Sequence, residues 1–98
     1  MNRPLDPDMV LEYCCSRLDI PKWIVKSKER RNKNEVRLRK TIVLLLLELT
    51  DLNHEGVANL INRKRPLVNY YEKTFKNWDH QYVADYKKIK EEIRNLYE

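Results

Sequence analysis

The sequence predicts one compact all-α domain of five to six helices over residues 1–98. Apolar residues recur at helical spacing along most of the chain, and no segment alternates with period two for long enough to form a strand. The chain has one glycine and four prolines, and 42% of its residues are hydrophobic. This composition supplies a modest core for one domain and excludes a disordered chain.

The first predicted helix begins with strong N-terminal signals. Asp6 is placed to cap it, Pro7 occupies its first position, and Asp8 lies in the first turn, where the helix dipole favours an acid. The side chains expected to face inward are those of Val10, Tyr13 and Cys14.

A short second helix is predicted after Pro21, with Trp23 and Ile24 as its buried anchors. Residues 27–34 form a polar, basic loop, and Asn34 is placed to cap a long third helix over residues 35–49. That helix contains six consecutive aliphatic residues, far short of the roughly 20 that span a bilayer. We therefore expect a core helix surrounded by other helices.

Two closely spaced helices follow a break at residues 50–53. The first covers HEGVANLI, with Val57, Leu60 and Ile61 inward, and residues 62–65 form a tight turn in which Asn62 tolerates a left-handed backbone. Pro66 then begins the next helix, where its missing N–H costs nothing. The buried stripe expected along that helix consists of Val68, Tyr71, Phe75 and Trp78.

Asp79 is placed to cap a terminal helix. The inner face expected for this helix is formed by Tyr82, Val83, Tyr86, Ile89, Ile93 and Leu96.

Positive charge is concentrated in two blocks. The chain has 20 Lys and Arg against 15 Asp and Glu, a net charge of +5. Residues 22–40 hold nine cations and two acids, net +7, and residues 62–78 hold five cations and one acid, net +4. Basic blocks on an otherwise balanced background are typical of a surface that binds a polyanion, although a solvated charged face is the simpler alternative.

No pattern in the sequence indicates an enzyme, a metal or a cofactor. Cys14 and Cys15 are adjacent, His54 and His80 are isolated, and there is no C-x-x-C or phosphate-binding glycine motif. We expect no cofactor and no catalytic group. The adjacent cysteines, with no secretory signal before them, indicate a reducing cytoplasm.

The short helix, the turn and the basic helix after it predict a helix-turn-helix that binds double-stranded DNA. In such a unit the second helix enters the major groove with its N-terminus leading. Arg63, Lys64 and Arg65 would form the leading tip and contact base edges, since arginine bonds guanine in bidentate fashion. One turn on, Asn69 would read adenine; Pro66 and Leu67 would contact a thymine methyl group.

The stretch VRLRKTIVLLLLELTDLNHEGVANLINRKRPLVNYYEKTF resembles the C-terminal DNA-binding domain of the bacterial replication initiator DnaA, which has a Trp-repressor-like helix-turn-helix. The basic loop KSKERRNK, the helix HEGVANLI, the signature position RKRPLV and the ending WDHQYVADYKKIKEEI all have counterparts in that family, so the resemblance covers about residues 10–95. It implies a role in replication initiation or its regulation. It also implies that Arg39 reaches into the minor groove.

Phosphate contacts are expected from the basic loop, from the first turns of the long third helix and from the helix that follows the turn. The residues assigned to this role are Lys28, Arg30, Arg31, Lys33, Arg37, Lys40, Tyr70 and Lys73.

The chain departs from the family at four signature positions. Lys64, Arg65, Pro66 and Leu67 replace Asp, His, Ser or Thr, and Thr, and a glycine of the turn is missing. We therefore expect a different DNA target and favour a monomer, with a replication or regulatory protein as a further partner. Two alternatives remain open. One is non-specific nucleic-acid binding; the other is a protein-interaction module that uses Tyr70, Tyr97 and the terminal helix.

Overall fold

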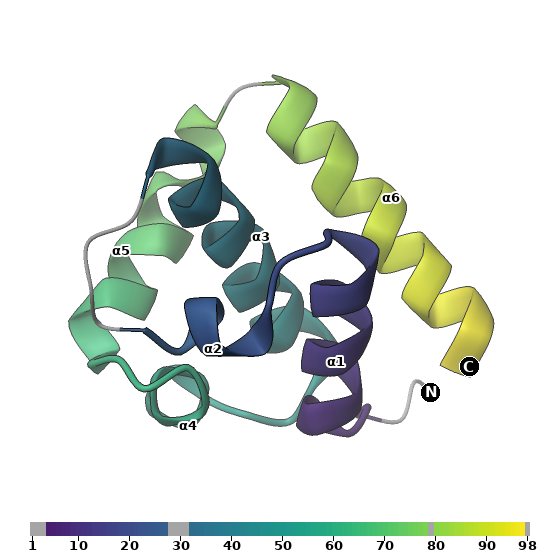
Figure 1. Cartoon of the computed structure of the whole chain (residues 1–98), viewed down its shortest axis with the longest axis horizontal. Coiled ribbons are helices and arrows are strands. Elements are labelled where there is room, and N and C mark those ends of the chain that lie inside the picture. Colours follow the sequence, from purple (N-terminus) through teal and green to yellow (C-terminus); the bar gives the residue numbers. More distant parts are fainter. Residues whose placement is uncertain (1–3, 28–31, 79, 98) are drawn as a thin grey trace.

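The structure is a computed structural model that describes residues 4–27, 32–78 and 80–97. Within these ranges the chain forms six α-helices and a short 3-10 helix and contains no strand; the isolated bridge between Leu5 and Thr50 is its one β-type pairing. The all-α prediction is therefore confirmed (Figure 1). The elements are α1 (Pro7–Arg17), α2 (Lys22–Val25), α3 (Lys33–Leu49), α4 (His54–Leu60), α5 (Arg65–Thr74), η1 (Phe75–Asn77) and α6 (His80–Tyr97).

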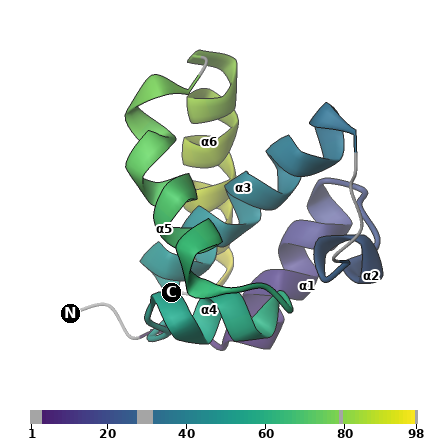
Figure 2. The same cartoon turned by 90° about the vertical axis from the view of Figure 1, so that its left-hand side faces the viewer.

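Helix α3 runs through the centre of the molecule, with α1, α5 and α6 packed around it (Figures 1 and 2). The aliphatic run from Ile42 to Leu46 is buried throughout, as expected for a helix enclosed by others. Each fully buried leucine or isoleucine contributes about 1.5–3 kcal/mol to burial free energy. The radius of gyration of 12.5 Å equals that of a compact domain, about 13 Å for a chain of this length.

Side-chain caps determine where three of the helices begin. The Asp6 carboxylate accepts from the backbone N–H of Asp8, and the Asn53 side chain accepts from the backbone N–H of Gly56 at the start of α4. Helix α3 is capped by Asn32, which accepts from the N–H of Glu35. The prediction that Asn34 caps this helix is wrong, because Asn32 offers the same cap earlier and adds two residues to the helix.

The turn between α4 and α5 has the predicted backbone. Asn62 adopts a left-handed conformation with φ of 59°, which its short polar side chain tolerates. Pro66 lies in the first turn of α5, one residue after the helix begins at Arg65. Helix α5 buries Val68 and Tyr71 as expected, but it ends at Thr74. Phe75 begins η1 and Trp78 follows its last residue, and both side chains are only partly buried.

Two expectations about the core are wrong. Trp23 is 63% exposed, because the α2 backbone turns the neighbouring Val25 into the core instead. Leu96 is 61% exposed, and in the last turn of α6 the neighbouring Tyr97 packs against Tyr13 of α1 instead. Asp79, the expected cap of α6, lies outside the described residues.

Candidate nucleic-acid interface

The N-terminus of α5 is an exposed cationic tip. Lys64, Arg65 and Pro66 are all exposed, and Lys64 occupies the N-cap position without a side-chain cap. The N-terminus of a helix carries the positive end of the helix dipole. In α5, Pro66 has no N–H and the N–H of Leu67 donates to the carbonyl of Lys64 at 3.1 Å, so the dipole rather than free backbone donors favours an anion. At this tip the dipole and two cationic side chains therefore act in the same direction, and both favour an anion.

The outer face of α5 is polar along its length. Pro66, Asn69, Tyr70 and Lys73 follow one another at spacings of three, one and three residues, which places them on one side of the helix, and all four are exposed. Tyr70 is 56% exposed. Val68 and Tyr71 lie on the opposite side, against the core. The helix thus presents a continuous polar surface next to its cationic tip.

Arg39 lies inside the molecule rather than on this surface. Its side chain is 3% exposed, and its guanidinium donates to the backbone carbonyl of Ile24 at 3.1 Å. The carbonyl belongs to α2, so Arg39 links α3 to α2. A guanidinium buried in this contact is not displayed toward a minor groove beside the helix-turn-helix, where the resemblance placed it.

Arg63 has a similar position. It is half-buried and donates to the backbone carbonyl of Ser27, while the neighbouring Asn62 side chain donates to the carbonyl of Lys26 at 3.4 Å. Burial and the nearby charge of Arg39 lower the pKa of Arg63 below its ordinary value. Together these contacts attach the turn between α4 and α5 to the chain that leads into the basic loop.

Leu67 and three turn residues surround an opening beside the tip. Asn62, Arg63, Lys64 and Leu67 line a groove of about 370 Å³, and Leu67 is half-buried in it. Leu67 is therefore less accessible than the neighbouring Arg65 and Pro66.

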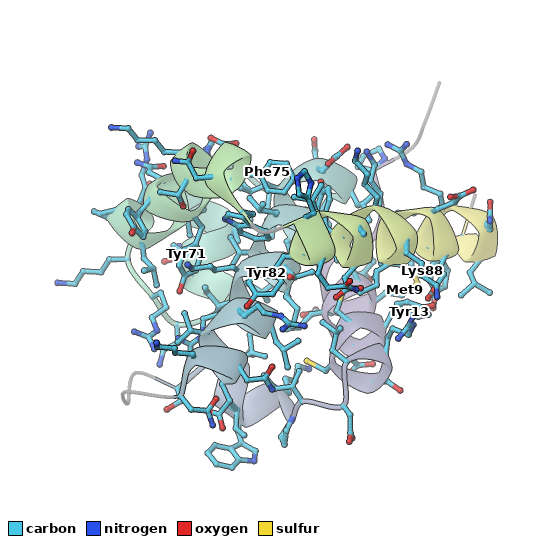
Figure 3. All side chains as sticks on the ribbon, turned by 90° about the horizontal axis from the view of Figure 1, so that it is seen from above. Met9, Tyr13, Tyr71, Phe75, Tyr82 and Lys88 are labelled. Atoms are coloured by element: carbon cyan, nitrogen blue, oxygen red, sulfur yellow. The ribbon has the colours of Figure 1, made fainter. Side chains whose placement is uncertain are left out.

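The cations of α3 gather along a second groove. Lys33, Arg37 and Lys40 line one side of it, and Asn77, Trp78 and Tyr82 line the other, with Val36 completing a volume of about 390 Å³. The Arg37 guanidinium lies 4.1 Å from the centre of the Tyr82 ring, and its Nη2 lies 3.6 Å from a carboxylate oxygen of Asp85. Figure 3 shows Tyr82 at the start of α6, on the side of the molecule that carries Tyr71 and Phe75.

Sequence analysis assigned the three cations of this groove to DNA phosphates but assigned Trp78 and Tyr82 only to the core. Helical spacing predicts that both side chains are buried, and in the structure both are half-buried. The groove itself arises where η1 meets α6, and periodicity within one helix does not reveal such a junction.

The candidate residues therefore fall into separate groups. Figure 2 shows α4 and α5 facing the viewer, with α3 rising beside them. Of the assigned phosphate contacts, Lys33, Tyr70 and Lys73 are exposed, and Arg37 and Lys40 are half-buried. The remaining assigned phosphate contacts, Lys28, Arg30 and Arg31, lie outside the described residues.

Neither a metal cluster nor a bilayer-crossing helix is found in the part of the chain that the structure describes. No group of three or more His, Cys, Asp or Glu side chains is placed to hold an ion, and none of the described helices combines the length and apolarity that a membrane span requires. Comparison of the sequence with models of known protein families and with curated proteins finds no match.

Proposed function

We propose that this protein binds double-stranded DNA through a helix-turn-helix formed by α4, the turn and α5, with α5 as the recognition helix. The observation that carries the proposal is the exposed, uncapped N-terminus of α5, where Lys64 and Arg65 lead a polar face. A recognition helix enters the major groove with its N-terminal residues against base edges, and this tip meets that requirement.

The proposed base contacts are divided by exposure. Lys64 and Arg65 are exposed and suit guanine, Asn69 suits adenine, and Pro66 suits the methyl group of thymine. Leu67 is half-buried and would contribute less to the contact with bases. Tyr70 and Lys73, further along α5, and the α3 cations would contact phosphates and set the register of the helix in the groove.

Arg39 and Arg63 have a positioning role in this proposal. The Arg39 bond to the carbonyl of Ile24 holds α3 against α2, and the Arg63 bond to the carbonyl of Ser27 holds the turn before the recognition helix against the chain that follows α2. The sequence interpretation, in which both side chains contact bases, would require them to leave these carbonyls on binding. The observed contacts favour the positioning role.

The proposed role in replication initiation or its regulation depends on the resemblance to the DnaA domain described above. The features that resemble that domain are the basic loop, the aliphatic helix and the signature position. The four departures in the signature favour a different DNA target. The residues at those positions include Lys64 and Arg65, the most accessible cations of the tip.

Sequence-specific reading can be tested by selection. Fluorescence anisotropy of the chain with a random-sequence duplex pool at two salt concentrations would be followed by sequencing of the bound fraction. We expect binding that weakens steeply with salt and an enriched motif, because several phosphates are neutralised. Salt-sensitive binding without a motif would support the non-specific alternative, and no binding at low salt would refute the proposal.

The protein-partner alternative receives less support. Helix α5, which carries Tyr70, and the C-terminal end of α6, which carries Tyr97, lie on opposite sides of the molecule (Figure 1). The Tyr97 ring instead meets Tyr13 edge to face, with ring centres 6.3 Å apart. The two tyrosines therefore do not form one continuous partner surface.

A further inference from the structure

The groove between α3 and the junction of η1 with α6 has an aromatic wall that duplex binding by α5 does not use. It is lined by cations from α3 on one side and by Trp78 and Tyr82 on the other. Its volume of about 390 Å³ lies within the range of about 300–1,000 Å³ that is usual for sites that bind small organic groups. A simple phosphate contact on a surface does not require the aromatic wall.

The charge of the groove favours an anion. Lys33 is exposed at the start of α3, and Arg37 and Lys40 follow one and two turns later on the same side of the helix. Asp85 pairs with Arg37 at 3.6 Å and offsets one of the three positive charges. A phosphate group in the groove would therefore meet an excess of positive charge.

The aromatic wall favours a flat ring next to that phosphate. Trp78 is half-buried, and its ring is held edge to face against Phe75 with ring centres 5.0 Å apart. The ring of Tyr82 is already covered by the guanidinium of Arg37. Trp78 is thus the better candidate for stacking on a base, the interaction that single-strand binding proteins combine with a cationic groove.

We propose that this groove binds an unpaired nucleotide of single-stranded nucleic acid, with the phosphate against Lys33 and Arg37 and the base against Trp78. The base must be unpaired, because a base inside a duplex is stacked on both sides and offers no free face to an aromatic side chain. The proposal shares Lys33 and Arg37 with the proposed phosphate contacts to duplex DNA, but the stacking of an unpaired base on Trp78 has no counterpart in the proposed reading of duplex DNA by α5.

Trp78 can report its own ligand. The chain has two tryptophans, and the other, Trp23, is exposed on α2 and does not line the groove. In the Trp23→Phe protein all tryptophan emission comes from Trp78. A short oligothymidylate would be titrated into this protein, with a blunt duplex, thymidine monophosphate and inorganic phosphate as parallel probes.

A matched pair of variants separates the groove from general attraction between charges. Lys33→Gln removes an exposed charge at the groove, and Lys87→Gln removes an exposed charge from α6, outside the groove. Both are made in the Trp23→Phe protein, and circular dichroism would confirm that each remains folded. We expect Lys33→Gln to weaken oligothymidylate binding by about three- to tenfold at low salt and Lys87→Gln to have little effect.

The expected result is saturable quenching of Trp78 by oligothymidylate and by thymidine monophosphate, with the oligomer tighter and the duplex much weaker. Quenching by inorganic phosphate to the same extent and at the same concentrations would overturn the proposal, because the base would then contribute nothing. An absence of quenching by any thymidylate, or equal losses in Lys33→Gln and Lys87→Gln, would also overturn it.

Discussion

At the scale of single residues, accessibility divides the basic side chains into two kinds. Lys64 and Arg65 project into solvent, whereas Arg39 is buried and Arg63 is half-buried, each donating to a backbone carbonyl. The helix-turn-helix pattern placed Arg63, Lys64 and Arg65 in a DNA contact, and the family resemblance placed Arg39 there. Both depend on residue type and position and do not show which way a side chain turns. Local carbonyls at the end of α2 decide that direction, and they are brought there by tertiary folding.

Replacing Arg39 by alanine is expected to destabilise the protein. The change removes a buried guanidinium, leaves the carbonyl of Ile24 without this donor and creates a cavity, at a cost of about 2–4 kcal/mol. Lys64→Ala is the matched control, because an exposed side chain changes stability by less than about 0.5 kcal/mol. Urea unfolding of both variants measures the difference. Equal stability of Arg39→Ala and the original protein would contradict the positioning role.

The two thiols are expected to be unreactive in the folded protein. Both cysteines are free and buried, and burial raises the pKa of Cys14 to about 12 and also raises that of Cys15. Because only the thiolate is nucleophilic, alkylation at pH 7 should be slow until the chain unfolds. Mass spectrometry after iodoacetamide treatment, with and without urea, checks this. Rapid labelling of Cys14 without denaturant would contradict the described packing of α1.

At the scale of elements, contacts between helices that are distant in sequence set the architecture. Tyr13 and Arg17 of α1 both donate to the carboxylate of Glu92 on α6, at 2.8 and 2.9 Å. Figure 3 shows Tyr13 beside the C-terminal half of α6, close to Lys88. The caps of α1 and α4 and the left-handed turn at Asn62 follow from local chemistry and were predictable. The junction that forms the α3 groove depends on where α5 stops, and no local signal marks that end.

The Glu92 contact predicts a stability change in acid. Hydrogen bonds from Arg17 and then Tyr13 lower the pKa of Glu92 below its ordinary value of 4.5. A carboxylate with a lowered folded-state pKa stabilises the protein above the unfolded-state pKa, and that stabilisation is lost as pH falls through the folded-state value. Thermal unfolding between neutral and strongly acidic pH should show this loss. In Glu92→Gln that part of the pH dependence should disappear, and an unchanged profile would contradict the contact.

The left-handed turn predicts a difference between two substitutions of Asn62. Asn62→Ala and Asn62→Gly both lose the side-chain bond to the carbonyl of Lys26, but only alanine is strained at a φ of 59°. We expect Asn62→Ala to be less stable than Asn62→Gly by about 1 kcal/mol. Chemical denaturation of the pair measures this directly. A more stable alanine variant would show that the turn has a different backbone.

At the scale of the whole molecule, the two basic blocks lie on helices that pack against each other, α3 and α5. Helices α4 and α5 face the viewer in Figure 2, with α3 beside them and α6 behind. Composition already indicated two basic blocks, and the all-α fold followed from helical periodicity. The separation of accessible from buried cations within those blocks could not be predicted, because it depends on how α2, α3 and the turn pack together.

The central claim is that the tip of α5 binds duplex DNA, and a binding measurement by fluorescence anisotropy tests it most directly. Anisotropy of a duplex would compare the original protein with Lys64→Gln/Arg65→Gln and with Lys87→Gln/Lys88→Gln, which removes the same charge from exposed positions on α6. The duplex would be the selected sequence, or a mixed-sequence duplex if no motif is enriched. We predict a loss of about tenfold or more for the tip variant at moderate salt and a small loss for the α6 variant. Equal losses, or no salt-sensitive binding by the original protein, would contradict the claim.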